Sequence, residues 1–371
     1  MIRNATLDDI DALVALENQC FETDRLSRRN FRHLLSKGHA LTLVDTGDGQ
    51  LRGYIMLLFN AGTSLARLYS IAVGPGFRGQ GVGRRLEQAA EKAALAKDCV
   101  SMRLEVRRDN ISSIRLYEAI GYRQIGVIED YYEDHMDALR YEKQLAPHLG
   151  IDVVPVPYYQ QTLDFTCGPA SLMMAMKALD DRVEVDRREE IRIWRESTTV
   201  FMTSGHGGCG PYGLALSAYH RGFDVEIYVT EEGTMFINSV RSEEKKEVIR
   251  LVEDDFIEEI NLLPLPIHPR PLSVEEIRAE FDNGAIPVVL ISSYRIYREK
   301  FPHWVVVTGF DDRFIYVHDP YVDTEKGKTV TDTMNMPILQ KDFERMARYG
   351  KTAQRAALIL RRRGRKRMKQ K

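Results

Sequence analysis

The chain has 371 residues, more than one typical hydrophobic core accommodates, so two domains are expected. Its 44% hydrophobic and 29% charged residues, with a formal net charge of −2, are typical of a globular protein, and no apolar run approaches the ~18–20 residues of a membrane helix. Four cysteines are too few for a disulfide framework, no Cys-x-x-Cys pair suggests zinc, and the N-terminus lacks a secretory signal, so we expect a cytoplasmic protein without a metal or a membrane span.

The first 145 residues alternate segments that are typical of helices and of strands. Thr6 is placed to cap the first helix, and the glycine-rich turn 45–49 predicts a β-hairpin. The expected elements are, in order, a helix at 7–16, strands at 40–44, 53–59 and 66–73, a helix at 83–97, a strand at 102–106 and a helix at 111–120.

A glycine-rich loop follows the strand at 66–73 and opens the next helix. It reads Arg78-Gly79-Gln80-Gly81-Val82-Gly83. Such a loop aims backbone N–H groups at an anion, and the helix N-terminus favours negative charge. Side chains at Gly81 and Gly83 would keep a phosphate from that backbone. The loop therefore predicts a pyrophosphate site, with an ordinary turn between a strand and a helix as the alternative.

Residues 1–145 resemble the GNAT acyltransferase superfamily, and within it the ribosomal-protein-alanine N-acetyltransferases. The segments 68–73, 78–83 and 105–122 carry the resemblance. It implies a GNAT domain over residues 1–147, acetyl-CoA as the co-substrate, and its pyrophosphate on the loop 78–83. It also implies that the pantetheine arm and its surroundings are contacted by Ile71, Ala72, Val73 and Asn110.

Amine acetylation requires a base for the ammonium proton and an acid for the departing thiolate. Glu105, at a strand end, and Tyr117, twelve residues later, match the family pattern for these two roles. The alternatives are a surface carboxylate for Glu105 and a packed aromatic for Tyr117. Tyr131 and Tyr132 resemble the acceptor-side segment of peptide-acetylating members, and packing inside the domain is their alternative role.

Three prolines in 147–157 and the loss of regular patterns predict a linker at 148–157. A second domain is expected over 158–360. Its expected elements are a helix at 167–179, a charged helical insertion at about 231–273, and strands at 286–292, 304–308 and 314–317. Eight basic residues form a tail at 361–371, for which a solvated terminus is favoured over contact with nucleic acid or ribosomes.

Four residues of the second domain have the pattern of a nucleophilic site. Cys167 opens a helix, whose N-terminus favours a thiolate. His303 opens a strand and Asp319 ends the next one, so antiparallel pairing of the strands would bring them together. Gln161, six residues before Cys167, is placed to stabilise an oxyanion.

These residues and their flanks, 158–170 and 303–320, resemble papain-like cysteine peptidases, most closely the bacteriocin-processing peptidases that cleave after double-glycine leaders. The resemblance implies Cys167 as nucleophile, His303 as base, Asp319 as orienting group and Gln161 as oxyanion donor. The chain departs from these relatives in having no membrane span, in the segment 231–273, and in a second Cys-Gly-Pro at Cys209. We interpret Cys209 as a packed or substrate-side residue and His318 as a strand residue.

The sequence thus predicts two α/β (α+β) domains, a GNAT fold with a mixed central sheet and then a papain-like fold. The expected function is acetyl-CoA-dependent N-acetylation of a peptide or protein amine, joined to cleavage or capture of a peptide. Two alternatives stay open. The second domain could be a peptide-binding module without catalysis, and the acetyl acceptor could be a small-molecule amine.

Overall fold

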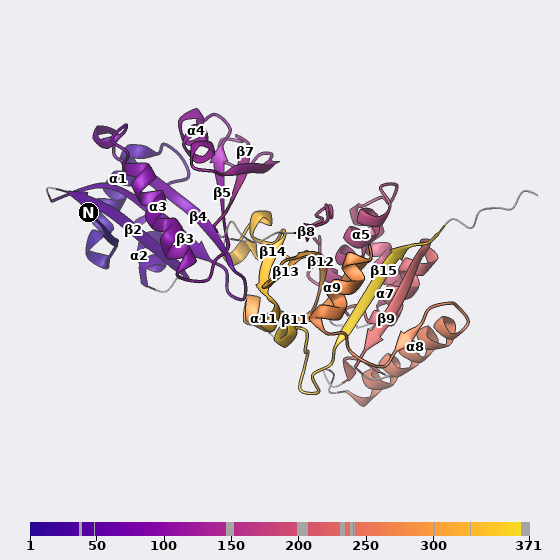
Figure 1. The fold of residues 1–371 in the computed structure, drawn as a ribbon. Helices are drawn as coiled ribbons and strands as arrows, with labels where there is room; N and C mark the ends of the chain where they lie inside the picture. Colours follow the sequence, from indigo (N-terminus) through magenta and orange to yellow (C-terminus); the bar gives the residue numbers. More distant parts are fainter. Residues whose placement is uncertain are drawn as a thin grey trace, which may run out of the picture. The chain divides into compact units, whose positions relative to one another are not determined.

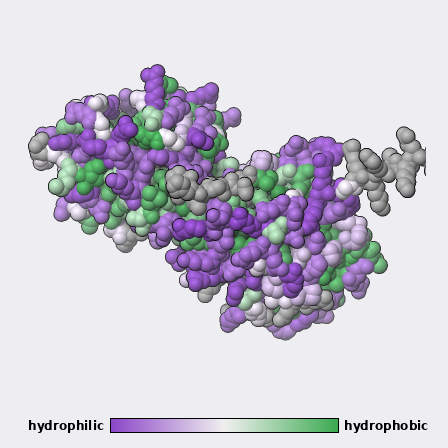
Figure 2. Space-filling view, viewed as in Figure 1, coloured by the Kyte–Doolittle hydropathy of each residue, from purple (hydrophilic) through white to green (hydrophobic). Residues whose placement is uncertain are grey.

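The computed structural model describes residues 1–36, 39–47, 49–145, 152–198, 207–230, 234–237, 240, 242–299, 301–326 and 328–364. The chain divides into two compact units, residues 1–149 and 150–371 (Figure 1). The face drawn in Figure 2 is mostly hydrophilic, as expected where apolar side chains fill the interior. Among the described residues, none of the helices is long and apolar enough to cross a membrane.

The first unit is built on a seven-stranded mixed sheet with the strand order β1-β2-β3-β4-β5-β7-β6. β4 and β5 are parallel, and the other neighbours are antiparallel. The strands are β1 (Ile2–Asn4), β2 (Ala40–Gly47), β3 (Gln50–Phe59), β4 (Leu65–Val73), β5 (Ser101–Arg107), β6 (Arg123–Ile128) and β7 (Ala138–Gln144).

Helices cover both faces of this sheet. Tyr54 and Ile55 are consecutive residues of β3 and so point to opposite faces. Tyr54 belongs to a core formed with the first two helices, and Ile55 to a core formed with the next two. The helices are α1 (Ile10–Cys20), α2 (Arg28–Ser36), α3 (Val82–Leu95) and α4 (Ile111–Ala119), with short 3-10 turns η1 (Leu7–Asp9) and η2 (Pro75–Phe77).

The second unit contains an eight-stranded sheet with the order β10-β9-β15-β11-β12-β13-β14, and β8 pairs with β12. β10 and β9 are parallel, and the other pairs are antiparallel. The longest apolar run of the chain forms the central strand β11. The strands are β8 (Asp152–Val153), β9 (Phe223–Val229), β10 (Ile267–His268), β11 (Ile286–Ser292), β12 (Pro302–Phe310), β13 (Phe314–His318), β14 (Met336–Leu339) and β15 (Ala356–Arg362).

Helix α5 packs against β11 and β12, and α7 packs against β9. α5 is apolar on all sides because strands and the helices α6 and α7 surround it. The helices are α5 (Cys167–Leu179), α6 (Arg187–Ser197), α7 (Pro211–His220), α8 (Glu243–Asn261), α9 (Val274–Asp282), α10 (Tyr294–Tyr297) and α11 (Gln340–Met346), with 3-10 turns η4 (Thr324–Lys326) and η5 (Val330–Asp332).

The segment 231–273, expected as a charged helical insertion with a solvated face, is part of the domain core. It does contain the long helix α8, which lies along α7 (Figure 1). It also supplies the edge strand β10, and Leu265 and Leu272 are buried in the core. The sequence did not predict this contribution to the core, because α8 is highly charged and its few buried residues, such as Ile249 and Ile260, are spread among exposed ones. Residues 231–233, 238, 239 and 241 lie outside the described part.

Parts of the predicted linker and of the predicted tail belong to the fold of the second unit. Val153 and Asp152 pair with β12, and the imidazole of His318 contacts the Val156 carbonyl oxygen at 2.8 Å. At the other end, the expected boundary at residue 360 falls inside β15, where Arg361 pairs with Glu226 and Glu280. Arg363 also donates to Asp224 at 2.9 Å, so the start of the predicted tail is part of the folded unit, although Arg362 is exposed. Residues 146–151, of which 148–151 belong to the predicted linker, and the tail residues 365–371 lie outside the described residues.

Candidate active sites

In the first unit, β4 and β5 separate where the pantetheine arm is expected. Their parallel pairing runs from Leu65 to Leu68 on β4. Beyond it, Ile71, Ala72 and Val73 stay paired with β3. One backbone edge of this stretch therefore has no strand partner among the described residues.

The loop 78–83 has the conformation that its glycines permit. Gly79 and Gly81 have φ values of +75° and +73°, in the left-handed region that a larger side chain avoids. Gly81 is the N-cap of α3, and Gly83 lies in the first turn of that helix. Arg78 donates to the Val73 carbonyl and Arg85 to the Gln80 carbonyl, at 3.2 Å and 2.9 Å, so both ends of the loop are braced. The backbone of Gln80 and Val82 lies near the start of α3, between the residues that make these two hydrogen bonds.

Glu105 is buried and paired, unlike a surface carboxylate. Its side chain is 4% exposed, and Arg67 donates to its Oε2 from Nε and Nη2, both at 2.9 Å. The same guanidinium donates to the Tyr131 hydroxyl at 3.0 Å, and Tyr131 packs edge-on against Tyr132 with ring centroids 5.0 Å apart. Arg67 thus joins the predicted base to the predicted acceptor-side tyrosines. Sequence reasoning missed it, although a charged residue in the apolar strand Ala66-Arg67-Leu68 was a signal.

Tyr117 lies on α4 and is 4% exposed. Its ring packs edge-on against Tyr122, with centroids 5.5 Å apart. Burial, and then the nearby carboxyl of Glu87, raise the pKa of Tyr117 above its usual value. Asn110 is the N-cap of α4, where its side chain accepts the Ser113 N–H at 3.2 Å. Both residues lie on the segment that leaves β5 where β4 and β5 separate.

In the second unit, three predicted residues meet in the interior. Cys167 is the first residue of α5, His303 lies on β12, and Asp319 directly follows β13. His303 Nε2 donates to Asp319 Oδ1 at 2.6 Å, and the Cys167 side chain is within hydrogen-bonding reach of the same ring. Burial alone would lower the pKa of His303, but the Asp319 carboxylate and the Cys167 sulfur outweigh it and raise the pKa to about 10. The arrangement can hold an imidazolium beside a sulfur nucleophile.

Asp319 is fixed by donors that the sequence did not reveal. Tyr297 donates its hydroxyl to Oδ2 at 2.7 Å, and the Tyr321 N–H donates to Oδ1 at 2.9 Å. These bonds leave Oδ1 aimed at His303 and keep the imidazole in one orientation. Tyr297 lies on α10, and sequence spacing alone does not relate it to Asp319.

Gln161 lies on the loop before Cys167 and is 7% exposed. Its backbone N–H donates to the Pro320 carbonyl at 2.9 Å, which ties the loop to the residue after Asp319. Its Nε2 donates to the Leu163 carbonyl at 2.8 Å, and its Oε1 is buried with no partner among the described atoms. The Nε2 group carries a second N–H besides the one that donates to Leu163.

The buried carboxylate of Glu190 anchors this loop. It accepts hydrogen bonds from the Tyr159 hydroxyl at 2.9 Å and from the Thr162 N–H and hydroxyl at 2.8 Å and 2.7 Å, and Thr166 also contacts it. Glu190 comes from α6 and is fully buried. The loop between Tyr159 and Cys167 is therefore held from α6 as well as from Pro320.

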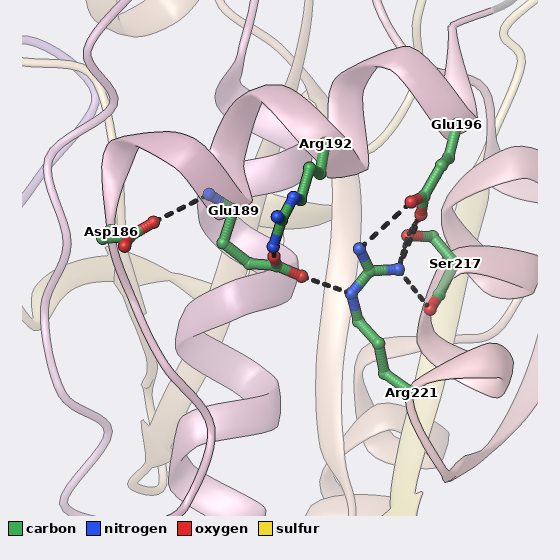
Figure 3. Close-up of polar contacts among 6 residues, drawn as sticks. All are labelled: Asp186, Glu189, Arg192, Glu196, Ser217 and Arg221. Atoms are coloured by element: carbon green, nitrogen blue, oxygen red, sulfur yellow. Dashed lines mark hydrogen bonds and ion pairs between the residues drawn. The ribbon is translucent and has the colours of Figure 1, made fainter.

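Polar contacts in turn hold α6 on α7 (Figure 3). Arg221 donates to Glu189 at 2.6 Å, to Glu196 at 2.6 Å and to the Ser217 hydroxyl at 2.7 Å. A surface hollow of about 560 Å³ lies beside these residues, with Arg221 and Glu189 in its wall, and none of the predicted site residues lines it.

Cys209 is packed in the hydrophobic core and His318 is a residue of strand β13, as the sequence favoured. Burial, and then the Cys167 sulfur, raise the pKa of the Cys209 thiol well above its usual value, and the Cys209 carbonyl accepts from the Trp304 indole at 3.0 Å. His318 contacts the Val156 carbonyl through Nε2 at 2.8 Å and accepts the Asn335 N–H through Nδ1 at 2.9 Å, so both ring nitrogens are used. Among the described residues, no group of His, Cys, Asp and Glu could hold a metal ion.

Comparison with known proteins relates the two units to different families. Residues 156–361, more than half of the chain, match the Peptidase_C39 like family, and residues 9–122 match the acetyltransferase (GNAT) family. A putative [ribosomal protein bS18]-alanine N-acetyltransferase of Bacillus subtilis is 32% identical over 136 residues, which are 36% of this chain and 87% of that protein. An N-alpha-acetyltransferase of Sulfurisphaera tokodaii is 32% identical over 148 residues, 37% of this chain and 88% of that protein.

Among solved structures, the ribosomal-protein-S18-alanine N-acetyltransferase from Escherichia coli is similar to part of this chain. It is 24% identical, with a TM-score of 0.36, over 39% of this chain and 93% of that chain. The two relatives and this structure each cover between 36% and 39% of this chain.

Proposed function

Because the chain belongs to the Peptidase_C39 like family, and its N-terminal domain to the GNAT acetyltransferase family, we propose that it acetylates peptide or protein amines and also cleaves or captures peptides. In this proposal residues 1–147 form the acetyltransferase domain, and residues from 158 onward form the peptidase-like domain. The two activities are argued separately.

Acetyl-CoA is the expected co-substrate, as in the GNAT family. The edge of Ile71 to Val73, which has no strand partner beyond β3 among the described residues, supports a place for the pantetheine arm. The loop 78–83 at the start of α3 supports a place for the pyrophosphate. The proposed cofactor-binding residues are Ile71, Ala72, Val73, Arg78, Gly79, Gln80, Gly81, Val82, Gly83 and Asn110.

For the chemistry, we assign Glu105 as the base and Tyr117 as the group that hands a proton to the departing sulfur. Arg67 donates to Glu105 Oε2, and the ammonium proton would reach the Glu105 carboxylate directly or through water. The burial of Glu105 among Arg67 and Tyr131 is the observation that supports this assignment best. The names of the relatives favour an α-amine of a peptide or protein over a small-molecule amine.

The acetyltransferase assignment is tested with the full-length chain, acetyl-CoA and a peptide with an N-terminal alanine, with mass spectrometry of the product. We expect N-terminal acetylation, and we expect Tyr117→Phe to lower kcat by roughly 10²–10⁴-fold with little change in acetyl-CoA affinity. Acetylation of lysine side chains or small amines alone would contradict the acceptor assignment. A Tyr117→Phe variant with the wild-type rate would return Tyr117 to a packing role.

For the second domain, the contact of Cys167 and Asp319 with one imidazole supports a cysteine peptidase, with Gln161 as oxyanion donor. The alternative is a domain that binds peptides without cutting them. The two are separated by incubating wild type and Cys167→Ala with a diverse peptide library. Fragments that appear with the wild type alone support the peptidase, and binding without fragments in both supports the alternative.

A further inference from the structure

A buried carboxyl lies beside Tyr122, whose ring packs against that of the predicted acid Tyr117, and it has no role in the chemistry described so far. Glu87, on α3, is 1% exposed. The Tyr122 hydroxyl donates to its Oε1 at 2.7 Å, whereas its Oε2 has no hydrogen-bond partner among the described atoms. No arginine or lysine forms an ion pair with it among the described residues. A bare carboxylate in such a place is costly, so Glu87 is expected to be a neutral acid with its proton on Oε2.

The groups around Glu87 agree with a neutral acid. Burial raises its pKa to about 8, and the Glu91 carboxyl one helical turn later adds to the rise, against a lowering by Tyr122 and Lys143. Lys143, from β7, pairs with Glu91 and lies 5.8 Å from the Tyr122 ring centroid. Glu91 and Lys143 are both about one-fifth exposed, so this pair connects Glu87 with solvent.

The pKa of Tyr117 alone is poorly matched to that of the departing thiol of coenzyme A. Its phenol ordinarily has a pKa of about 10, and burial raises it further. A thiol such as that of coenzyme A has a pKa of about 8.5, so a thiolate would not take the proton of Tyr117 unless another acid replaced it. An efficient general acid has a pKa near the working pH. Glu87 is such an acid, and Tyr122, which donates a hydrogen bond to it, packs edge-on against Tyr117.

We propose that Glu87 supplies the proton that leaves with the thiol of coenzyme A, and that Tyr117 relays it. As the acceptor nitrogen bonds to the acetyl carbon and the carbon–sulfur bond breaks, Tyr117 gives its hydroxyl proton to sulfur. Glu87 gives its Oε2 proton through a bridging water to the Tyr117 oxygen and becomes a carboxylate. Solvent then restores the proton through Glu91. Glu87 acts through Tyr117 and is a positioning residue, and the inference rests on the proposed acetyltransferase function.

The test measures thiol release from acetyl-CoA by the full-length chain, with an N-terminal alanine peptide as acceptor and with water alone. Glu87→Gln keeps the side-chain shape and an oxygen for Tyr122 but cannot pass a proton. We expect about a 10²-fold lower kcat, with an acetyl-CoA Kd by calorimetry within about twofold of wild type. Glu118→Gln is the matched control, because Glu118 also accepts a tyrosine hydroxyl, that of Tyr141 at 2.9 Å, but lies exposed. We expect the control to have the wild-type rate.

The pH profile separates proton supply from structural support. The wild-type rate should fall as pH rises above about 8, because Glu87, with Glu91, Lys143, Tyr122 and Tyr117 around it, loses its proton there. Glu87→Gln should lack this fall. If that variant does not fold, Glu87→Asp keeps an acid and should retain the fall at a lower rate. An unchanged kcat, or the same fall in Glu87→Gln, would overturn the inference alone, whereas a wild type that releases no thiol with either acceptor would overturn the proposed function as well.

Discussion

At the scale of single residues, the surroundings of the His303 imidazole bear on the chemistry proposed for the second domain. Its Nε2 bonds to Asp319, which leaves Nδ1 for Cys167. With a pKa raised to about 10, it carries a positive charge through neutral pH and loses that charge as the pH rises through about 10. A cation beside the sulfur favours the thiolate, and the thiolate is the reactive form.

We therefore expect iodoacetamide to alkylate Cys167 at pH 6.5 at least about tenfold faster than Cys209, whose thiol pKa is raised by burial and by Cys167. Mass spectrometry of the labelled peptides ranks the cysteines. His303→Ala should slow the labelling of Cys167 and leave Cys99 unchanged, because Cys99 lies in the other unit. Faster labelling of Cys209, or no response to His303→Ala, would contradict the choice of nucleophile.

At the scale of elements, the loop before α3 contains glycines that are needed for different reasons. Gly81 has a positive φ, so Gly81→Ala should lower the free energy of unfolding by about 1–2 kcal/mol. Gly83 is helical, and a Cβ there would meet Leu116 and Val73 at ordinary distances of 3.5 Å and 3.7 Å. Gly83→Ala should leave stability in urea unchanged or raise it, yet weaken acetyl-CoA binding in calorimetry. Wild-type affinity in Gly83→Ala would remove the pyrophosphate from this turn.

The loop before α5 is anchored by Glu190. The contribution of this anchor to the free energy of unfolding can be measured. Several donors converge on Glu190, so Glu190→Gln places an NH₂ group against at least one of them. We expect the free energy of unfolding to fall by about 1–3 kcal/mol, the cost of a buried unsatisfied group. Glu196→Gln is the control on the same helix. It weakens a partly exposed pair with Arg221 and should cost less than about 1 kcal/mol. Equal losses in the two variants would contradict the anchoring role.

Strongly periodic or apolar elements could be predicted from the sequence, and elements defined by tertiary contacts could not. The helix at Cys167–Leu179 and the strand at Ile286–Ser292 have the predicted bounds, because both are apolar throughout. α2 was missed because Phe31 is its single buried residue, and β6 because its side chains are mostly exposed. Motif spacing indicated Cys167, His303 and Asp319, which the structure brings together. Arg67, Glu87, Glu190 and Tyr297 were missed, because their partners lie far away in the sequence.

At the scale of the whole molecule, the chain joins an acetyltransferase domain to a peptidase-like domain. The product proposed for the second domain is a substrate proposed for the first. Hydrolysis of a peptide bond by a cysteine peptidase creates a new α-amino group. An α-amino group of a peptide is the acceptor proposed for the first domain. A shared substrate would therefore give the fusion a chemical purpose, in which the second domain produces the amine that the first domain acetylates.

A peptide with a blocked N-terminus, no lysine and an internal Gly-Gly pair tests this order of events. Since it has no free amine, it can be acetylated only after it is cut. We expect the wild type to yield a C-terminal fragment with an acetylated N-terminus. Cys167→Ala should yield no fragment, and Tyr117→Phe should yield the fragment with little or no acetyl group, as read by mass spectrometry. Fragments that the wild type releases but never acetylates, while it acetylates a separate free peptide, would show that the two domains do not share a substrate.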